Sequence, residues 1–164
     1  MYDADYIQHA ELTQRLKNGA NWFYWIAGLT IITSIITFFG GGWRFFISLG
    51  STQLIDAIAD ALAAEIGNAA KVVALVLDMV ITAAFVGFGV LAGKKLVWAY
   101  IAGMVVFLLD GLVNLFIQDW IGLVAHVVVL VLMVPGLQAG RELNSLERRM
   151  TEQAAQSPPQ PEPV

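Results

Sequence analysis

The sequence lacks cysteine and is poor in charged residues. Without cysteine, disulfide bonds, thiolate metal sites and cysteine nucleophiles are all excluded. Asp, Glu, Lys and Arg make up 13% of the 164 residues, whereas soluble domains carry about 25%. The net charge of −4 leaves no strongly basic surface of the kind that binds nucleic acid, so we expect no nucleic-acid partner.

Familiar catalytic motifs are missing as well. The sequence contains no G-x-S-x-G, no H-E-x-x-H, no P-loop and no dinucleotide-binding fingerprint. No stretch of the chain therefore points to a nucleophile, a phosphate-binding loop or a cofactor site. We expect a protein that is not an enzyme and that holds no cofactor.

Four long apolar runs dominate the remaining sequence. Hydrophobic residues make up 58% of the chain, and the mean hydropathy is +0.70. The runs cover residues 20–39, 72–93, 96–117 and 120–138. At about 1.5 Å per helical residue, each run is long enough to cross a bilayer core of about 30 Å. The sequence therefore predicts an all-α integral membrane protein, a bundle of four transmembrane helices over residues 20–138.

Basic residues between the runs predict the orientation, because cytoplasmic loops are enriched in Lys and Arg. Seven of the nine basic residues fall in segment 1–19, in the second loop and in segment 139–164. We therefore place both terminal segments in the cytoplasm and the bundle in the cell membrane, which is the inner membrane in a Gram-negative cell. Short helices are expected over 5–17 and 137–155, with a disordered, proline-rich tail after the second. The seven basic residues are Arg15, Lys17, Lys94, Lys95, Arg141, Arg148 and Arg149, against Arg44 and Lys71 on the other side.

The first outer loop, residues 40–71, is too long for a turn and predicts one further helix. Within it, the helical spacing of residues 52–66 places apolar residues on one face and acidic residues on another, so we expect an amphipathic helix. Ser51 or Thr52 could cap its start, and Gly67 could end it. Three positions are open: flat on the outer leaflet, across the outer mouth of the bundle as a lid, or re-entrant. We expect one of the first two, in which the helix lies across the membrane normal and is not a fifth span.

Ionisable side chains inside apolar runs are costly and therefore mark candidate functional positions. Asp78, Asp110 and His126 lie seven, eight and seven residues from the polar residues Lys71, Gln118 and Asp119 that flank the outer ends of their runs, about 10–12 Å deep. We expect them to meet in one layer, with at least two of them in contact. Further polar residues at a similar depth are Thr33, Ser34 and Asn114.

This polar layer has three interpretations. Its residues could hydrogen-bond one another and hold the helices together. They could form a pathway for protons or cations. They could also bind a metal ion through Asp78, Asp110 and His126, although the Glu-x-x-His pairs of di-iron bundles are absent.

Small residues and aromatic residues complete the expected bundle. Gly87, Gly89, Gly93 and Gly103 are candidates for close helix contacts, and Tyr100 is expected at the inner membrane interface as an aromatic anchor. Pro135 predicts a kink or the end of the fourth span.

The combined prediction is a non-enzymatic accessory or interaction subunit of a membrane assembly, which contacts lipid and either another membrane protein or further copies of itself. The alternative is a transporter component that conducts protons or cations through the polar layer.

Overall fold

The computed structural model describes residues 2–39 and 49–156, which form five α-helices. All but the second are long and apolar enough to cross a membrane. Two predicted features, the Gly-rich start of the first outer loop at 40–44 and the proline-rich tail at 157–164, lie outside the described residues. The helices are α1 (Tyr2–Phe38), α2 (Gly50–Ile66), α3 (Asn68–Gly93), α4 (Val97–Phe116) and α5 (Trp120–Gln156).

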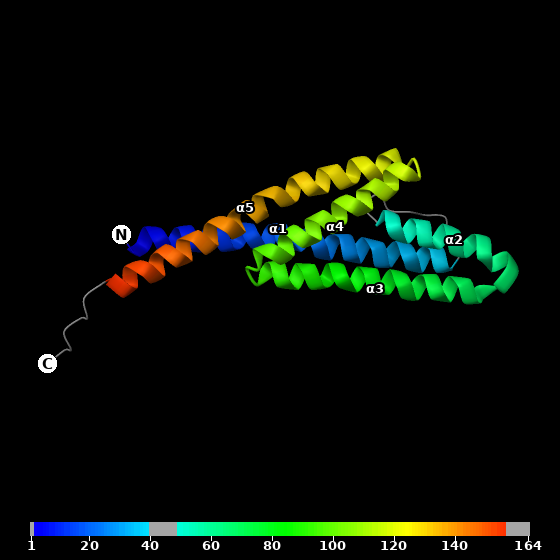
Figure 1. Ribbon diagram of the computed structural model, residues 1–164, viewed down its shortest axis with the longest axis horizontal. Helices are drawn as coiled ribbons and strands as arrows, with labels where there is room; N and C mark the ends of the chain where they lie inside the picture. The colour runs from blue at the N-terminus through cyan, green and yellow to red at the C-terminus, as the bar shows by residue number, and fades with distance from the viewer. Residues whose placement is uncertain (1, 40–48, 157–164) are drawn as a thin grey trace.

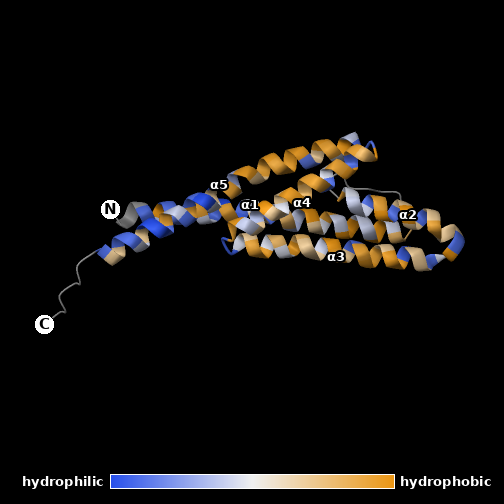
Figure 2. Ribbon diagram, in the orientation of Figure 1, coloured by the Kyte–Doolittle hydropathy of each residue, from blue (hydrophilic) through white to orange (hydrophobic). Residues whose placement is uncertain are grey.

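The first and last helices are longer than the spans predicted for them. Each has 37 residues, because the short helices expected at 5–17 and 137–155 continue without a break into the adjoining apolar runs. The two helices run side by side beyond the rest of the bundle (Figure 1). Their projecting ends are hydrophilic on the outside (Figure 2). Apolar side chains buried between them are Leu12, Leu16, Leu143 and Leu146.

Pro135 lies inside α5 and does not end it. A proline removes one backbone N–H from the helical ladder and crowds the preceding turn, so it bends a helix that continues through it. Figure 1 shows α5 changing direction along its length. Pro135 was expected either to kink the fourth span or to end it, and the structure shows a bent helix that continues.

The helices α1 and α5 cross where both carry glycine. A Cβ atom added to Gly19 would lie 2.7 Å from the Cα of Gly136, so the two backbones touch directly. The hydroxyl of Tyr100 also lies against both glycines and donates a 2.9 Å hydrogen bond to the carbonyl of Met133. Tyr100 is 1% exposed, so the expectation that it anchors the bundle at a membrane surface is wrong. Its hydroxyl has a partner inside the bundle instead.

The second helix lies along α3, with which it makes most of its contacts. Figure 1 shows α2 running in nearly the same direction as the long helices, from the middle of the bundle to its far end. It therefore does not cross the end of the bundle, as the lid position requires. The helix ends at Gly67 as expected, in a left-handed conformation with φ of 67°, and α3 begins at Asn68.

Only some of the predicted small residues make close helix contacts. A Cβ atom at Gly89 would lie 3.0 Å from the ring of Tyr24, and one at Gly103 would lie 2.6 Å from the ring of Phe23. At Gly87 and Gly93 there is open space within 4 Å. Gly89 and Gly103 therefore let the phenyl and phenol rings of α1 pack against α3 and α4.

Candidate functional site

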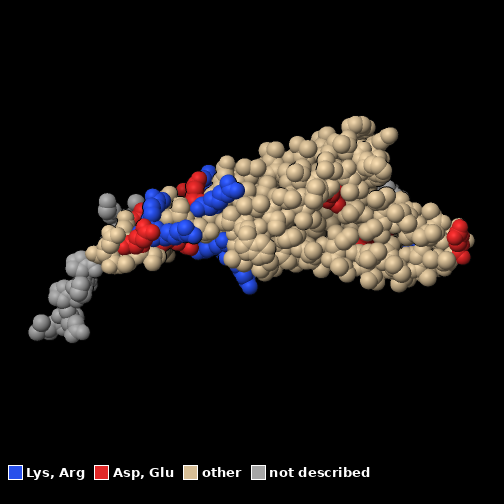
Figure 3. All heavy atoms as spheres, viewed as in Figure 1, with Lys and Arg blue, Asp and Glu red and all other residues tan. Residues whose placement is uncertain are grey.

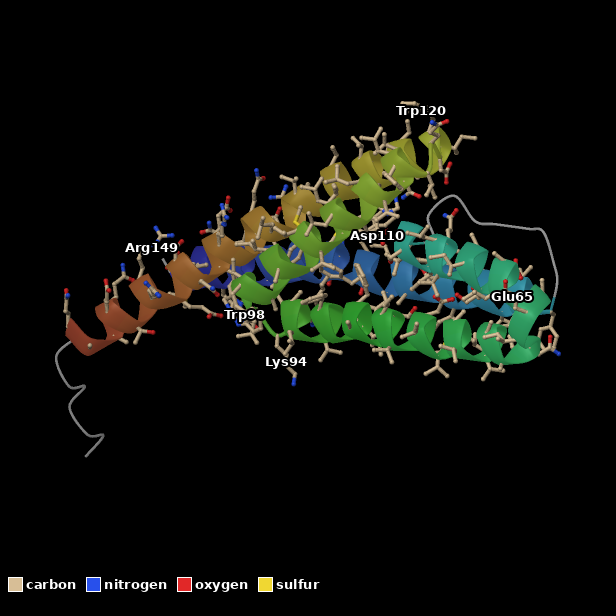
Figure 4. The ribbon with its side chains drawn as sticks, turned by 45° about the vertical axis from the view of Figure 1, so that its right-hand side comes forward. Glu65, Lys94, Trp98, Asp110, Trp120 and Arg149 are labelled. Atoms are coloured by element: carbon tan, nitrogen blue, oxygen red, sulfur yellow. The ribbon has the colours of Figure 1, made fainter. Side chains whose placement is uncertain are left out.

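The carboxylate of Asp110 in α4 binds the first turn of α2. Its Oδ2 accepts hydrogen bonds from the backbone N–H of Gly50 at 2.6 Å and from Nε2 of His126 at 3.0 Å. Its Oδ1 accepts from the backbone N–H of Ser51 at 2.9 Å and from the Ser51 hydroxyl at 2.6 Å. Figure 4 shows Asp110 beside the start of α2, with Glu65 at the opposite end of that helix. We call Asp110, Asn114, His126, Gly50 and Ser51 the Asp110 cluster.

This arrangement follows from the chemistry of a helix N-terminus. The first N–H groups of a helix have no partner within the helix and carry partial positive charge, so they bind a carboxylate well. The residue before α2, Leu49, is wholly buried and has no side-chain cap to offer. Its own N–H donates to the hydroxyl of Thr30 in α1 at 3.2 Å. The expected caps, Ser51 and Thr52, are thus replaced by a carboxylate from another helix.

The imidazole of His126 is fixed on three sides. Its Nε2 faces Asp110, and its Nδ1 lies 2.8 Å from the carbonyl of Gly122 and 3.2 Å from Nδ2 of Asn114. The ring of Phe107 stacks on it at a centroid distance of 4.2 Å. Histidine, asparagine and aspartate in this cluster are therefore held in one orientation, each at most 6% exposed.

Glycine makes room for the cluster. A Cβ atom at Gly50 would come within 2.8 Å of the Asn114 amide, and one at Gly111 would come within 3.3 Å of His126. At Gly122 it would meet Asn114 Oδ1 at 3.0 Å. The three helices that meet here each place a glycine against a polar side chain, so the backbones approach closely.

Asp78 belongs to a second polar group. Its Oδ2 accepts a 2.7 Å hydrogen bond from the hydroxyl of Ser34 in α1, while its Oδ1 has no hydrogen-bond partner. The hydroxyl of Thr82, one turn further along α3, also lacks a partner. Both residues are buried, at 0% and 1% exposure. This group therefore has fewer hydrogen bonds than its polar atoms could make.

A small cavity adjoins the Ser34 side of this group. Its volume is about 10 Å³, which is room for about one water molecule. Besides Ser34 it is lined by Thr37 and Phe38 of α1, Asp56, Ala59 and Asp60 of α2, and Lys71 and Leu75 of α3. Lys71 pairs with Asp60 at 2.9 Å at its rim.

The structure joins the predicted polar residues into two groups. Asp110 and His126 are in contact, with Asn114 beside them, as expected. Asp78 bonds Ser34 instead, and Thr33 donates to the carbonyl of Leu29 in its own helix at 3.0 Å. Within residues 2–39 and 49–156 no three His, Asp or Glu side chains come together as metal ligands. The metal-binding set of Asp78, Asp110 and His126 is therefore not assembled there.

Sequence reasoning missed the partners that come from α2 and from Thr30. The sequence predicts Ser51 as a cap for its own helix, and Asp56 as an acidic residue that suits the positive N-terminal half of that helix. A signal was present, because Gly50-Ser51-Thr52 forms a small polar entry to a helix with no acidic residue in its first turn. Such a helix start is suited to a carboxylate from elsewhere.

A third polar cluster ties the projecting ends of α1 and α5 to the loop between α3 and α4. Oε1 of Glu147 lies 2.5 Å from Nζ of Lys95 and 2.9 Å from Nε2 of His9. Lys95 and His9 hold the pKa of Glu147 below its usual range. His9, in the N-terminal segment, has a side chain that is 31% exposed and pairs with Glu147.

Comparison with known proteins provides no name for this arrangement. No protein family, no curated protein and no solved structure was found to match the chain.

Proposed function

We propose that the chain is a four-span integral membrane protein that serves as a non-enzymatic accessory subunit of a membrane assembly. In this proposal α1, α3, α4 and α5 cross the bilayer, and both terminal segments lie in the cytoplasm. Valine, leucine and isoleucine side chains are exposed along the outside of α3, α4 and the first half of α5. A surface of this kind is suited to lipid and not to water.

The distribution of charge supports this orientation. Figure 3 shows Lys, Arg, Asp and Glu gathered on the projecting ends of α1 and α5, next to a body almost free of charge. The basic residues of that end are the seven expected in the cytoplasm, and they include Lys94 and Lys95 between α3 and α4. Acidic atoms appear at the opposite end of the body in the same view.

In the proposed bilayer α2 is a re-entrant helix. Its start lies in the interior beside Asp110 and Thr30, and its end at Gly67 lies at the outer surface. Ile58, Leu62 and Ile66 are exposed on its outer side, where lipid would cover them. Backbone that is irregular at this depth is tolerated only when protein surrounds it, and Leu49 is indeed wholly buried.

The observation that favours a structural role for the polar layer is that hydrogen bonds occupy both oxygens of the Asp110 carboxylate. Both of its oxygens accept two hydrogen bonds, and two of the four donors are backbone N–H groups at the start of α2. A carboxylate so bound holds a segment in place and has no oxygen left for a moving ion. Asp110 and His126 thus serve as the attachment point of the re-entrant helix.

Flux through proteoliposomes tests this proposal. Vesicles that contain the protein should leak protons, sodium and potassium no faster than vesicles without protein. The variant Asp110→Asn should lower stability and leave the flux unchanged. Protein-dependent flux that disappears in a folded Asp110→Asn variant would show that the cluster conducts.

An accessory role also requires a partner, and the assembly state can be measured directly. Multi-angle light scattering in mild detergent distinguishes a monomer from a homo-oligomer. Copurification with one defined membrane protein, retained after crosslinking in intact cells, would identify a hetero-assembly. A strictly monomeric chain that crosslinks to nothing would contradict the proposal.

The second candidate function is a proton- or cation-conducting component. It is favoured by Asp78, because its Oδ1 is buried without a hydrogen-bond partner and its Ser34 neighbour lines a cavity. The flux assay separates this candidate from the first. Protein-dependent flux that is lost in Asp78→Asn, with folding retained, is its expected result.

A further inference from the structure

Asp78 is buried but does not belong to the Asp110 cluster that attaches α2. This side chain is 0% exposed and receives one hydrogen bond, from Ser34, whereas Asp110 receives four. Burial of an ionised carboxylate is costly unless hydrogen bonds or an opposite charge compensate it. Asp78 has a single donor, and its second oxygen has none.

A second carboxyl group lies next to Asp78. Asp56 of α2 and Ser34 line the same small cavity, and Ser34 is hydrogen-bonded to Asp78 at 2.7 Å. Asp56 and Asp78 therefore both adjoin Ser34. A carboxylate cannot donate a hydrogen bond, so the two groups can bond each other only through a proton.

We propose that Asp56 and Asp78 form a carboxyl pair that binds one proton. The bound proton gives Oδ1 of Asp78 the partner it lacks and removes one of two neighbouring negative charges. Carboxyl groups that share a site behave in this way because both cannot ionise at once. The pair joins the re-entrant helix to α3, as the Asp110 cluster joins it to α4 and α5.

The other described residues that line the cavity are neutral or already paired with each other. From α1 it faces Ser34 and Thr37, which are neutral. From α2 it faces Asp60, and from α3 it faces Lys71, whose Nζ lies 2.9 Å from Asp60. Lys71 is therefore already paired with a carboxylate outside the Asp56–Asp78 pair.

The cavity connects the site to water. It has room for about one water molecule, and its rim residues Lys71 and Asp60 have side chains that are 29% and 51% exposed. A proton can thus exchange between the pair and the aqueous phase on the α2 side. Binding at this site goes beyond the accessory role and does not require conduction across the membrane, so its test uses no flux.

Infrared spectroscopy of the wild-type protein in vesicles tests the proposal. Protonated carboxyl groups absorb in a C=O stretching band that carboxylates lack. We expect such a band at neutral pH, with the intensity of one carboxyl per chain, and a shift of the band when aspartate carries a ¹³C carboxyl label. Absence of the band from the wild-type protein, or its failure to shift with labelled aspartate, would overturn the proposal.

Variants assign the band to the pair. Asp78→Asn should abolish it. Asp56→Asn should abolish it too, because the new amide donates to Oδ1 of Asp78 and lets that carboxyl ionise. The matched control is Asp119→Asn, which changes a carboxylate that accepts from the Gly122 N–H at 3.0 Å, and it should leave the band unchanged. A band that survives in folded Asp78→Asn contradicts the proposal.

A bound cation is the competing occupant, and salt distinguishes it. If the pair holds a proton, replacing potassium chloride by sodium chloride leaves the band intact. Loss of the band in either salt, together with a higher thermal midpoint in that salt, would show a cation site and overturn the proposal. Both measurements use the wild-type protein, so they remain decisive if a variant does not fold.

Discussion

Gly19 of α1 and Gly136 of α5 touch through their backbones, since a Cβ atom on either one would lie 2.7 Å from the Cα of the other. The contact lies next to Tyr100, whose hydroxyl donates to the carbonyl of Met133. It brings the two longest helices together at the end of the bundle where their hydrophilic ends project.

Alanine at this crossing should destabilise the bundle. In Gly19→Ala or Gly136→Ala the added methyl group meets backbone that cannot rotate away, and overpacking of this kind costs about 1–3 kcal/mol. The controls are Gly28→Ala and Gly87→Ala, where a Cβ atom has open space within 4 Å. Thermal unfolding in detergent should show lower midpoints for the first two variants and unchanged or higher midpoints for the controls. Equal midpoints in all four would contradict the close crossing.

The Asp110 cluster should control the stability of α2. In Asp110→Asn the charge and at least one of four hydrogen bonds are lost; bonds to a charged group contribute about 1.5–3 kcal/mol. Hydrogen exchange should therefore accelerate in the first turn of α2 more than in α3. Ser51→Ala removes one donor and should have a smaller effect. Uniform acceleration throughout the chain would indicate general unfolding and not release of α2.

A methyl group at Gly50 should also loosen the first turn of α2, in this case by crowding its contact with α4. It would come within 2.8 Å of the Asn114 amide, so Gly50→Ala forces α2 away from α4. The control is Gly67→Ala. It lies at the other end of α2, where φ is 67°, so it disturbs that turn and not the first turn of the helix. In a Thr52→Cys background, Gly50→Ala should expose position 52 to thiol-labelling reagents, whereas Gly67→Ala should not.

The Glu147 cluster predicts a loss of stability in acid. Lys95 and His9 lower the pKa of Glu147 in the folded state, so its contribution is present above the unfolded pKa and disappears as the pH falls through the folded pKa. The side chain is 39% exposed, so the effect should be that of a surface ion pair, about 0.2–1 kcal/mol, and should weaken with salt. Glu147→Gln should reduce the acid dependence of the unfolding midpoint, whereas Glu152→Gln should not.

Labelling of single cysteines tests the proposed orientation, and the chain has no native cysteine to interfere. An impermeant reagent added to intact cells should label Glu65→Cys and should not label Lys94→Cys. Thr52→Cys should react from neither side, because position 52 is 1% exposed. Labelling of Lys94→Cys from outside would reverse the orientation, and labelling of Thr52→Cys would contradict the re-entrant position.

The apolar runs predicted the four long helices, because the length and hydropathy of a segment depend only on its own residues. The boundaries at Gly93, Phe116 and Trp120 agree with the expected spans within a residue or two. The helices expected over 5–17 and 137–155 are present as the polar ends of α1 and α5. That Leu12 and Leu143 share a common core there could not be predicted, because packing is a property of two segments.

The candidate site was predictable only in part for the same reason. Depth along a helix correctly brought Asp110, Asn114 and His126 together. It could not show that α2 enters the bundle, since Ser51 reaches Asp110 through folding of the whole loop. Tyr100 was assigned to a membrane surface from its residue type, and only the Gly19–Gly136 crossing shows why it is inside.

The pairing of the first helix with the last has a consequence for biosynthesis. Leu16 packs against α5 near Gly140, more than a hundred residues later in the chain. Contacts so distant in sequence form late, and unpaired apolar surface is what chaperones and proteases recognise. A ribosome that has delivered α1 to α4 therefore leaves the Leu12 and Leu16 stripe without its partner. A chain that stalls before α5 leaves Leu12 and Leu16 without the surface that buries them in the complete fold.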